Sequence, residues 1–187
     1  MNLSAVLLAG GKSRRMGRDK ATLLWKGRPL WQNQLDLLRT LRPNELLISA
    51  RDEPVWHPAD TMFVADQVPS RGPLSGLSAT LALTKSNYLL ALAIDLPFMR
   101  ESYLRFLCNQ VQPGRGVLPM ISERAESLAA IYPVEARSEF EAALRGEDFS
   151  LQSVTRELIQ AGKLTVVRVS QNDTGLFRNI NEPGDVE

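Results

Sequence analysis

Short apolar runs and longer segments with one apolar face follow each other along most of the chain. Residues 5–9 and 88–94 are almost entirely Ala, Val, Leu and Ile, whereas Trp and Leu recur at helical spacing within 29–41. Continuous apolar runs are typical of buried parallel strands. Their alternation with amphipathic segments predicts an α/β protein with a mostly parallel sheet, and the length of 187 residues suits one domain spanning 1–187.

The same pattern places the remaining elements. We expect further strands at 46–49, 61–66, 114–121, 128–132 and 163–169, with 88–94 as the central one. We expect helices at 29–41, after 67–76, and at 101–111, 135–144 and 151–161. Pro29 suits a first helical position, and Gly162 suits the position just past a helix end.

Three of the apolar runs end in residues that can handle a ligand. The first leads into Gly10-Gly11, the third extended piece ends at Asp66, and the central run is followed by Asp95. Ligands of open α/β sheets bind outside the carboxyl ends of the strands. We therefore expect these residues to lie together.

The first of these endings opens a strongly cationic stretch. Between Met1 and Arg28 there are seven Lys and Arg residues against one acid, Asp19, although the net charge of the whole chain is only +1. Glycines let backbone N–H groups approach phosphate oxygens, and fixed cations offset their charge. A polyphosphate is the ligand that this stretch predicts, with an ordinary charged turn as the alternative.

Two common phosphate motifs are excluded. A P-loop would need a glycine where Val6 stands, five positions before Gly11. The positions of Gly10, Gly11 and Gly17 do not fit the G-x-G-x-x-G fingerprint of dinucleotide-binding folds.

Asp95 is the strongest single candidate for chemistry. A lone carboxylate after seven mostly apolar residues is costly to bury unless it is paired or metal-bound. It could bind Mg²⁺, which takes one or two protein carboxylates and completes its shell with phosphate oxygens and water. The alternatives are a helix cap after Pro97 or a salt bridge, and for Asp66 the alternative is ordinary turn chemistry.

The stretch Leu8-Ala-Gly-Gly-x-Ser-x-Arg-Met-Gly-x-Asp-Lys20 resembles the signature loop of nucleotidyltransferases of the molybdenum cofactor guanylyltransferase type. Asp95-Leu-Pro97, Gly72-Pro-Leu-x-Gly76 and Asn179-Ile-Asn181-x-Pro183 resemble later motifs of the same family. The resemblance implies a Rossmann-like three-layer sandwich of the nucleotide-diphospho-sugar transferase type.

The resemblance also implies roles. The catalytic residues would be Arg15 facing the leaving pyrophosphate, Lys20 near the α-phosphate, and Asp95. Asp95 would hold Mg²⁺, with Asn181 as a second ligand. The nucleotide would be bound by Leu8, Ala9, Gly10, Gly11, Ser13, Lys20, Ser49, Asp66 and Asp95.

Some positions depart from the family pattern. Ser49 stands where an asparagine is frequent, Ser127 where a proline usually precedes the apolar residue, and Glu182 and Gly184 replace the usual Thr and acid. These differences affect the prediction of which nucleobase and which acceptor are used, and not the prediction of nucleotidyl transfer itself.

The resemblance implies Mg²⁺-dependent transfer of GMP from GTP to the phosphate of molybdopterin, with partners that could deliver the cofactor. A phosphate monoester is already mostly dianionic at neutral pH, so the reaction needs no dedicated base. Cytidylyl transfer, another phosphorylated acceptor such as a sugar phosphate, or a non-catalytic nucleotide-binding accessory protein remain alternatives.

Composition narrows the setting. The single cysteine, Cys108, excludes an internal disulfide and fits a reducing compartment, and we expect no nucleic-acid partner, no membrane association and a cytoplasmic location. The one histidine, His57, lies in a Pro-flanked stretch and is expected at the surface, and Cys108 in a helix core.

Overall fold

A single mixed sheet organises the molecule, whose structure is a computed structural model that describes residues 1–10 and 20–180. The strand order is β10-β7-β9-β6-β1-β4-β5, with β8 paired to β7 at the side. β1 pairs in parallel with β4 and β6, β4 with β5, and β10 with β7, while β9 is antiparallel to both neighbours. The expected mostly parallel α/β sheet is confirmed.

The strands span β1 Leu3–Leu8, β4 Glu45–Ala50, β5 Met62–Ala65, β6 Tyr88–Ala93, β7 Gly116–Ile121, β8 Arg124–Ala125, β9 Ala129–Pro133 and β10 Leu164–Arg168. A separate hairpin joins β2 Leu24–Trp25 to β3 Arg28–Pro29. The helices are α1 Leu30–Arg39, α2 Pro73–Leu83, α3 Glu101–Gln110, α4 Arg137–Arg145 and α5 Leu151–Gln160, with 3₁₀ turns η1 Lys20–Thr22, η2 Val134–Ala136 and η3 Gln171–Phe177.

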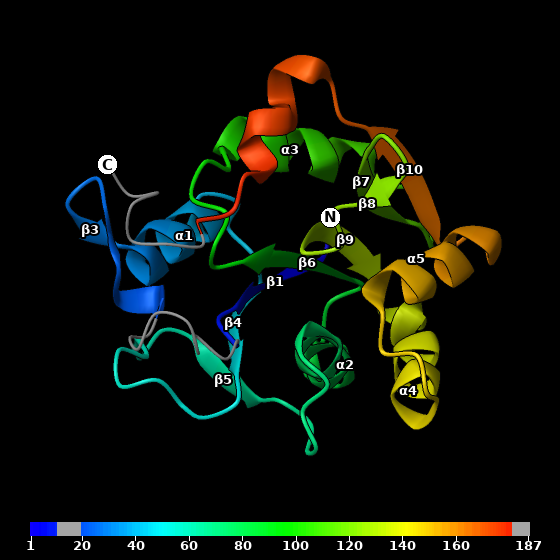
Figure 1. The fold of residues 1–187 in the computed structure, drawn as a ribbon, viewed down its shortest axis with the longest axis horizontal. Helices are drawn as coiled ribbons and strands as arrows, with labels where there is room; N and C mark the ends of the chain where they lie inside the picture. The colour runs from blue at the N-terminus through cyan, green and yellow to red at the C-terminus, as the bar shows by residue number, and fades with distance from the viewer. Residues whose placement is uncertain (11–19, 181–187) are drawn as a thin grey trace.

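Helices cover both faces of this sheet (Figure 1). α1 and α3 pack on one face with side chains such as Leu7 and Leu90, and α2, α4 and α5 pack on the other with side chains such as Val6 and Leu89. Every residue of β1 and β6 is buried. This burial on both faces explains why the two runs are apolar throughout rather than alternating.

Two local expectations are corrected, and one further element was not expected. Pro29 closes the β2–β3 hairpin and precedes α1 instead of occupying its first turn. The polar stretch 122–126 is not only a turn, because Arg124 and Ala125 fold back on β7 as strand β8, with Ser122 at a positive φ of 53°. The segment 171–177 forms η3, which its sequence pattern did not predict.

The described part of the chain contains no helix that is long and apolar enough to cross a membrane.

Candidate active site

The carboxyl ends of β1, β4, β5 and β6 meet at one edge of the sheet. The chain extends from these ends through paired backbone: the Ala9 N–H donates to the Ser49 carbonyl at 2.8 Å, and the Ile94 N–H donates to the Leu8 carbonyl at 3.1 Å. The predicted residues that follow β1, β5 and β6 are therefore held side by side by sheet hydrogen bonds.

Lys20 and Asp95 face each other at this edge. Lys20 Nζ lies 3.7 Å from Asp95 Oδ2 and donates a hydrogen bond to the Ile180 carbonyl at 3.1 Å. The Ile180 N–H in turn donates to the backbone carbonyl of Asp95 at 3.0 Å. Three segments distant in sequence thus meet at one carboxylate.

The environment of Asp95 is one of partial burial. Its side chain is 25% exposed. Burial raises the pKa of this carboxyl above its ordinary value, and the positive charge of Lys20 opposes that rise. A half-enclosed carboxylate beside one ammonium is poised to accept a further cation, because the ammonium alone does not offset its desolvation.

Asp66 belongs to a second cluster beside the first. Its Oδ1 accepts a hydrogen bond from Ser49 Oγ at 3.1 Å and its Oδ2 accepts one from Ser70 Oγ at 3.2 Å. A side chain at Gly10 would bring its Cβ to 3.3 Å from Asp66 Oδ2, so the backbone at Gly10 passes directly against this carboxylate.

Gly76 is the tightest contact in this cluster. A Cβ there would lie 2.6 Å from Ser49 Oγ and 3.1 Å from Asp66 Oδ1. The first turn of α2 therefore approaches the Ser49–Asp66 pair as closely as only glycine permits. The sequence motif includes Gly76, but the motif alone does not predict that Gly76 packs against the Ser49–Asp66 hydrogen bond.

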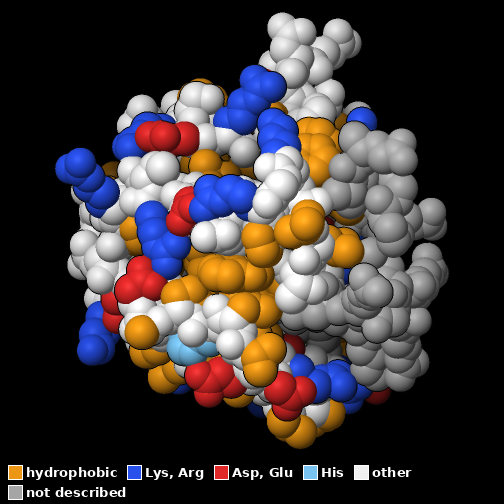
Figure 2. All heavy atoms as spheres, turned by 90° about the vertical axis from the view of Figure 1, so that its left-hand side faces the viewer, with side chains coloured by type: hydrophobic (Ala, Val, Ile, Leu, Met, Phe, Trp, Pro, Cys, Tyr) orange, Lys and Arg blue, Asp and Glu red, His pale blue; other side chains and the backbone are white. Residues whose placement is uncertain are grey.

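The structure brings together Leu8, Ala9, Gly10, Ser49 and Asp66 on one side of the edge and Lys20 and Asp95 on the other. Gly11, Ser13, Arg15 and Asn181, which complete the predicted set, lie outside the described residues. His57 is at the surface, with its ring nitrogens held by Glu53 at 2.7 Å and the Thr61 carbonyl at 3.0 Å; it is the pale-blue side chain in Figure 2.

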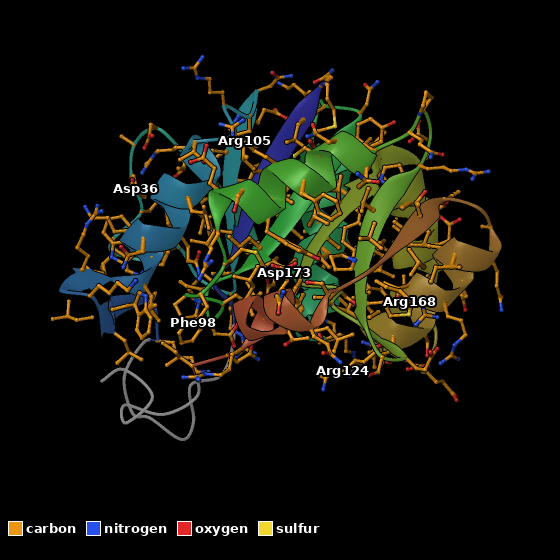
Figure 3. The ribbon with its side chains drawn as sticks, turned by 90° about the horizontal axis from the view of Figure 1, so that it is seen from above. Asp36, Phe98, Arg105, Arg124, Arg168 and Asp173 are labelled. Atoms are coloured by element: carbon orange, nitrogen blue, oxygen red, sulfur yellow. The ribbon has the colours of Figure 1, made fainter. Side chains whose placement is uncertain are left out.

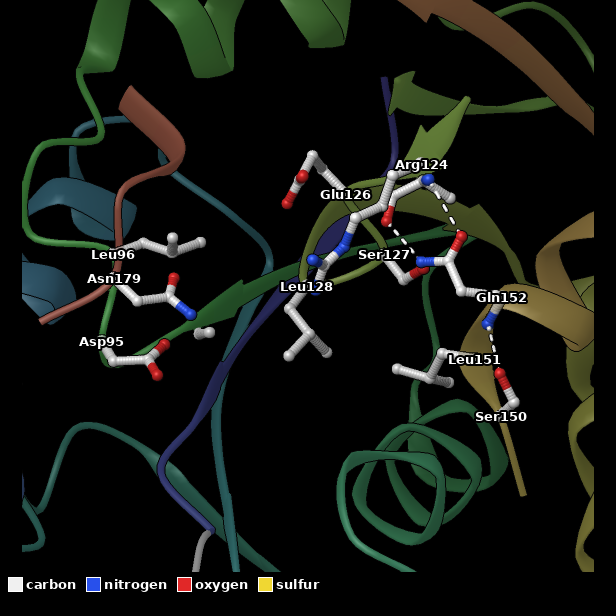
Figure 4. Close-up of a pocket in the computed structure, with 12 residues that line it drawn as sticks. Asp95, Leu96, Arg124, Glu126, Ser127, Leu128, Ser150, Leu151, Gln152 and Asn179 are labelled. Carbon is white, nitrogen blue, oxygen red and sulfur yellow. Dashed lines mark hydrogen bonds between the residues drawn. The ribbon is translucent and has the colours of Figure 1, made fainter. Parts of the chain in front are cut away.

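A pocket of about 220 Å³ opens next to Asp95 (Figure 4). One end is formed by Asp95, Leu96 and Asn179, and the other by the first turn of α5. Residues 124–128, from β8 and the segment before β9, form the wall between them. This pocket could not be predicted from the sequence, because its walls come from four segments spread over more than eighty positions.

Gln152 fixes one wall of this pocket. Its Nε2 donates to the Ala125 carbonyl at 2.7 Å, and its Oε1 accepts from the Ala125 N–H at 3.0 Å. α5 begins at the same place, with Ser150 Oγ accepting from the Gln152 N–H at 3.2 Å. The hairpin that carries Arg124 is thereby locked to the helix.

The oxygen donors at this edge of the sheet bear on whether a divalent metal ion could bind there. Within 1–10 and 20–180 no three His, Cys, Asp or Glu side chains form a metal cluster. A single carboxylate still fits Mg²⁺ when a nucleotide brings phosphate oxygens and water completes the shell. Asp95, half-buried and short of positive charge, fits that role.

A glycine turn, an ammonium and a half-buried carboxylate at the carboxyl edge of a mostly parallel sheet form a site for nucleotide phosphates and a counter-cation. Beside it lies a pocket that could hold a second substrate. This is the layout of a nucleotidyltransferase, an enzyme that moves a nucleotide from its triphosphate to an acceptor.

The chain belongs to the family of the MobA-like NTP transferase domain, whose model matches residues 5–164. It is 33% identical over 186 residues to the "Probable molybdenum cofactor guanylyltransferase" of Opitutus terrae, covering 98% of this chain and 92% of that protein. It is 31% identical to the molybdenum cofactor guanylyltransferase of Pseudomonas syringae pv. tomato, covering 96% and 89%.

Solved structures share the fold. Molybdopterin-guanine dinucleotide biosynthesis protein A from Archaeoglobus fulgidus superposes with a TM-score of 0.74 at 24% identity, covering 98% of this chain and 94% of that one. The 2-C-methyl-D-erythritol 4-phosphate cytidylyltransferase of Thermus thermophilus gives 0.67 at 18% identity, covering 97% and 94%. The chain is thus a nucleotidyltransferase, and its fold is that of the nucleotide-diphospho-sugar transferases, as its sequence predicted. Enzymes of this type generally need a divalent metal.

Proposed function

We propose that the protein transfers GMP from GTP to the terminal phosphate of molybdopterin, the organic part of the molybdenum cofactor, with release of pyrophosphate. The observation that carries the proposal is the meeting of Lys20 and Asp95, 3.7 Å apart, beside the glycine turn of β1. The names of the curated relatives supply the donor and the acceptor.

The reaction is an in-line displacement. An oxygen of the acceptor phosphate attacks the α-phosphorus of GTP, a new P–O–P link forms, and the bond to the β-phosphate bridging oxygen breaks, so that its electron pair leaves with pyrophosphate. The acceptor phosphate has a second pKa of about 6 and is mostly dianionic at pH 7, so no base is required. The protein contributes position and charge stabilisation.

Each residue has a role in this proposal. Lys20 would lie against the α-phosphate, where negative charge is transferred to the leaving oxygen. Gly10 would let the backbone approach the phosphates, with Arg15 on the pyrophosphate side. Asp66 and Ser49, linked at 3.1 Å, would position the nucleoside.

The metal ion proposed for this site is Mg²⁺, held by Asp95 with Asn181 as a second ligand. When bound, it would neutralise phosphate charge and lower the barrier to displacement. Lys20 and the metal ion would compete for the Asp95 carboxylate, which Lys20 already contacts. We therefore propose that the Lys20 ammonium turns from the carboxylate to the phosphate when the nucleotide binds.

The test is pyrophosphate release from each of the four ribonucleoside triphosphates, with and without purified molybdopterin or molybdenum cofactor and with Mg²⁺ or EDTA. We expect release only with GTP, acceptor and Mg²⁺ together. A preference for CTP would overturn the base assignment. Release with a sugar phosphate but not with molybdopterin would overturn the acceptor.

A further inference from the structure

The pocket beside Asp95 is lined by a positively charged side chain, that of Arg124. Among the described residues that line it, only Arg124 carries positive charge, while Asp95 and Glu126 carry carboxylates. Figure 4 shows the Arg124 side chain reaching from β8 across the pocket toward the strand end that carries Asp95. Arg124 therefore faces the place where transfer would occur.

Nothing in the described part of the chain neutralises this guanidinium closely. The ion pairs there include Arg168, at the end of β10, with Glu123 at 3.5 Å, but none that involves Arg124; Figure 3 labels both arginines. Glu123, adjacent to Arg124 in the sequence, pairs with Arg168. Glu126 lines the same wall as Arg124 and makes no ion pair with it at 4.0 Å or less, although the charge of Arg124 opposes the rise that burial causes in the pKa of Glu126. An exposed arginine held over a pocket without a carboxylate partner is available to an anion.

A second polar group in the same wall also lacks a partner. Ser127 is 5% exposed, and its Oγ has no partner in hydrogen-bonding geometry among the described residues, although the Tyr132 phenol lies close enough to interact with it. An unsatisfied buried hydroxyl costs stability, so its presence needs an explanation.

The opposite wall favours negative charge as well. The ten-residue helix α5 begins at the pocket, with Ser150, Leu151 and Gln152 lining it. Helix N-termini carry partial positive charge from their unpaired N–H groups. The guanidinium, the unpartnered hydroxyl and the helix end thus converge on one volume of about 220 Å³ that also reaches Asp95.

We propose that Arg124, assisted by the Ser127 hydroxyl, binds the phosphate of the acceptor and presents it to the α-phosphorus of the nucleotide. This inference rests on the proposed function and assigns the acceptor side of the same site. Lys20 and the glycine turn serve the donor phosphates, so a dianionic acceptor needs its own counter-charge to approach them. A bidentate guanidinium–phosphate contact provides it and fixes the direction of attack.

The experiment measures steady-state kinetics of Arg124→Gln, Arg124→Lys and Arg168→Gln with molybdopterin varied at saturating GTP, and then with GTP varied. For Arg124→Gln we expect the KM for molybdopterin to rise about 10- to 100-fold while the KM for GTP stays within about twofold. Arg124→Lys keeps the charge but not the two-pronged geometry and should recover part of the loss. Arg168→Gln, which removes a cation that already pairs with Glu123, should match the wild type.

Ser127→Ala separates a binding role from a structural one. Removing an unpartnered hydroxyl should leave the thermal unfolding temperature unchanged or higher, while the KM for molybdopterin rises severalfold. An unchanged KM for molybdopterin in Ser127→Ala would overturn the part given to the hydroxyl.

The two proposals fail in different ways. If the wild-type protein releases no pyrophosphate from GTP with molybdopterin, the proposed function is wrong. If the wild type is active and Arg124→Gln keeps its KM for molybdopterin, or raises the KM values for both substrates alike, the assignment of Arg124 is wrong while the function stands.

Discussion

Lys20 and Asp95 are 75 positions apart in sequence, yet Lys20 Nζ lies 3.7 Å from Asp95 Oδ2. The contact exists because β1 and β6 are parallel neighbours, paired from Leu3 with Tyr88 to Leu8 with Ala93, and their following segments must leave the sheet at the same edge. Lys20 also binds the Ile180 carbonyl, so the same ammonium ties the segment after η3 to this edge.

The first prediction concerns Asp95 itself. Asp95→Asn keeps the size of the side chain but removes the charge that would hold Mg²⁺, and we expect kcat for pyrophosphate release to fall by roughly 10³-fold. The thermal unfolding temperature should not fall, because the lost charge is one that burial disfavours. Turnover and unfolding are to be measured on the same preparation.

Asp60→Asn is the matched control for this substitution. Asp60 is an exposed carboxylate paired with Arg39 at 2.8 Å, and its loss should leave turnover within about twofold of the wild type. If Asp95→Asn retains wild-type turnover with Mg²⁺, Asp95 is not the metal ligand.

The second prediction concerns the close approach at Gly76. Gly76→Ala would place a Cβ 2.6 Å from Ser49 Oγ, so the hydroxyl must move and the Ser49–Asp66 hydrogen bond at 3.1 Å is strained or broken. We expect the free energy of unfolding to fall by about 1–3 kcal/mol. We also expect the KM for GTP to rise by about fivefold or more, because the Ser49–Asp66 pair would no longer be held in place. Denaturant unfolding and GTP titration measure the two effects.

Gly146→Ala serves as the control, because its Cβ would meet nothing closer than 3.5 Å. That variant should match the wild type in both measurements. A Gly76→Ala protein with wild-type GTP affinity would show that the Ser49–Asp66 pair does not position the nucleotide.

The sequence predicted the architecture and one edge of the site because both depend on local pattern. Apolar runs specify buried strands, and the residue after each run must appear at the carboxyl edge whatever the details of packing. Asp66 and Asp95 could therefore be placed beside the glycine turn without knowledge of any distance.

The pocket beside Asp95 could not be predicted in this way. Arg124 stands in a polar stretch that resembles any solvent-exposed turn, and its direction depends on the hairpin β7–β8 being held by Gln152, 27 positions away from Ala125. Whether the Ser127 hydroxyl finds a hydrogen-bond partner likewise depends on the tertiary structure around it. Pattern and spacing carry no information on either point.

The third prediction concerns alkaline pH. Tyr132 is fully buried, and burial raises the pKa of its phenol above the ordinary value, while the neighbouring Ser127 side chain opposes the rise. The Tyr132 hydroxyl donates a hydrogen bond to the Ser127 carbonyl at 2.7 Å, which favours the neutral phenol. Burial also raises the pKa of Tyr103 to about 12. Unfolded tyrosines ionise at about pH 10, so the stability linked to the neutral phenols is present below pH 10 and is lost as pH rises above it.

Two variants separate the hydrogen bond from the ionisation. Tyr132→Phe should cost about 1 kcal/mol at pH 7 through the lost hydrogen bond, whereas Tyr103→Phe should cost little, because the Tyr103 hydroxyl has no partner among the described residues. Each should flatten the fall in unfolding free energy from about pH 10 upward, where the unfolded tyrosine ionises and the buried one, with a pKa of about 12 for Tyr103, does not. A slope unchanged from the wild type in both variants would contradict the prediction.

The last prediction concerns Gln152, the link between α5 and the hairpin that carries Arg124. Gln152→Ala removes both hydrogen bonds to Ala125, at 2.7 and 3.0 Å, and leaves a buried backbone N–H and carbonyl to find other partners. We expect a loss of about 1–3 kcal/mol in the free energy of unfolding. Because the wall of the pocket is no longer fixed, the KM for molybdopterin should rise while the KM for GTP does not.

Gln160→Ala, at the exposed end of the same helix, is the control and should alter neither quantity. The comparison also bears on Arg124: if Arg124 binds the acceptor phosphate and Gln152 acts only by positioning it, Arg124→Gln and the double variant with Gln152→Ala should have nearly the same KM for molybdopterin. Additive effects of the two substitutions would mean that Gln152 contributes to acceptor binding independently of Arg124.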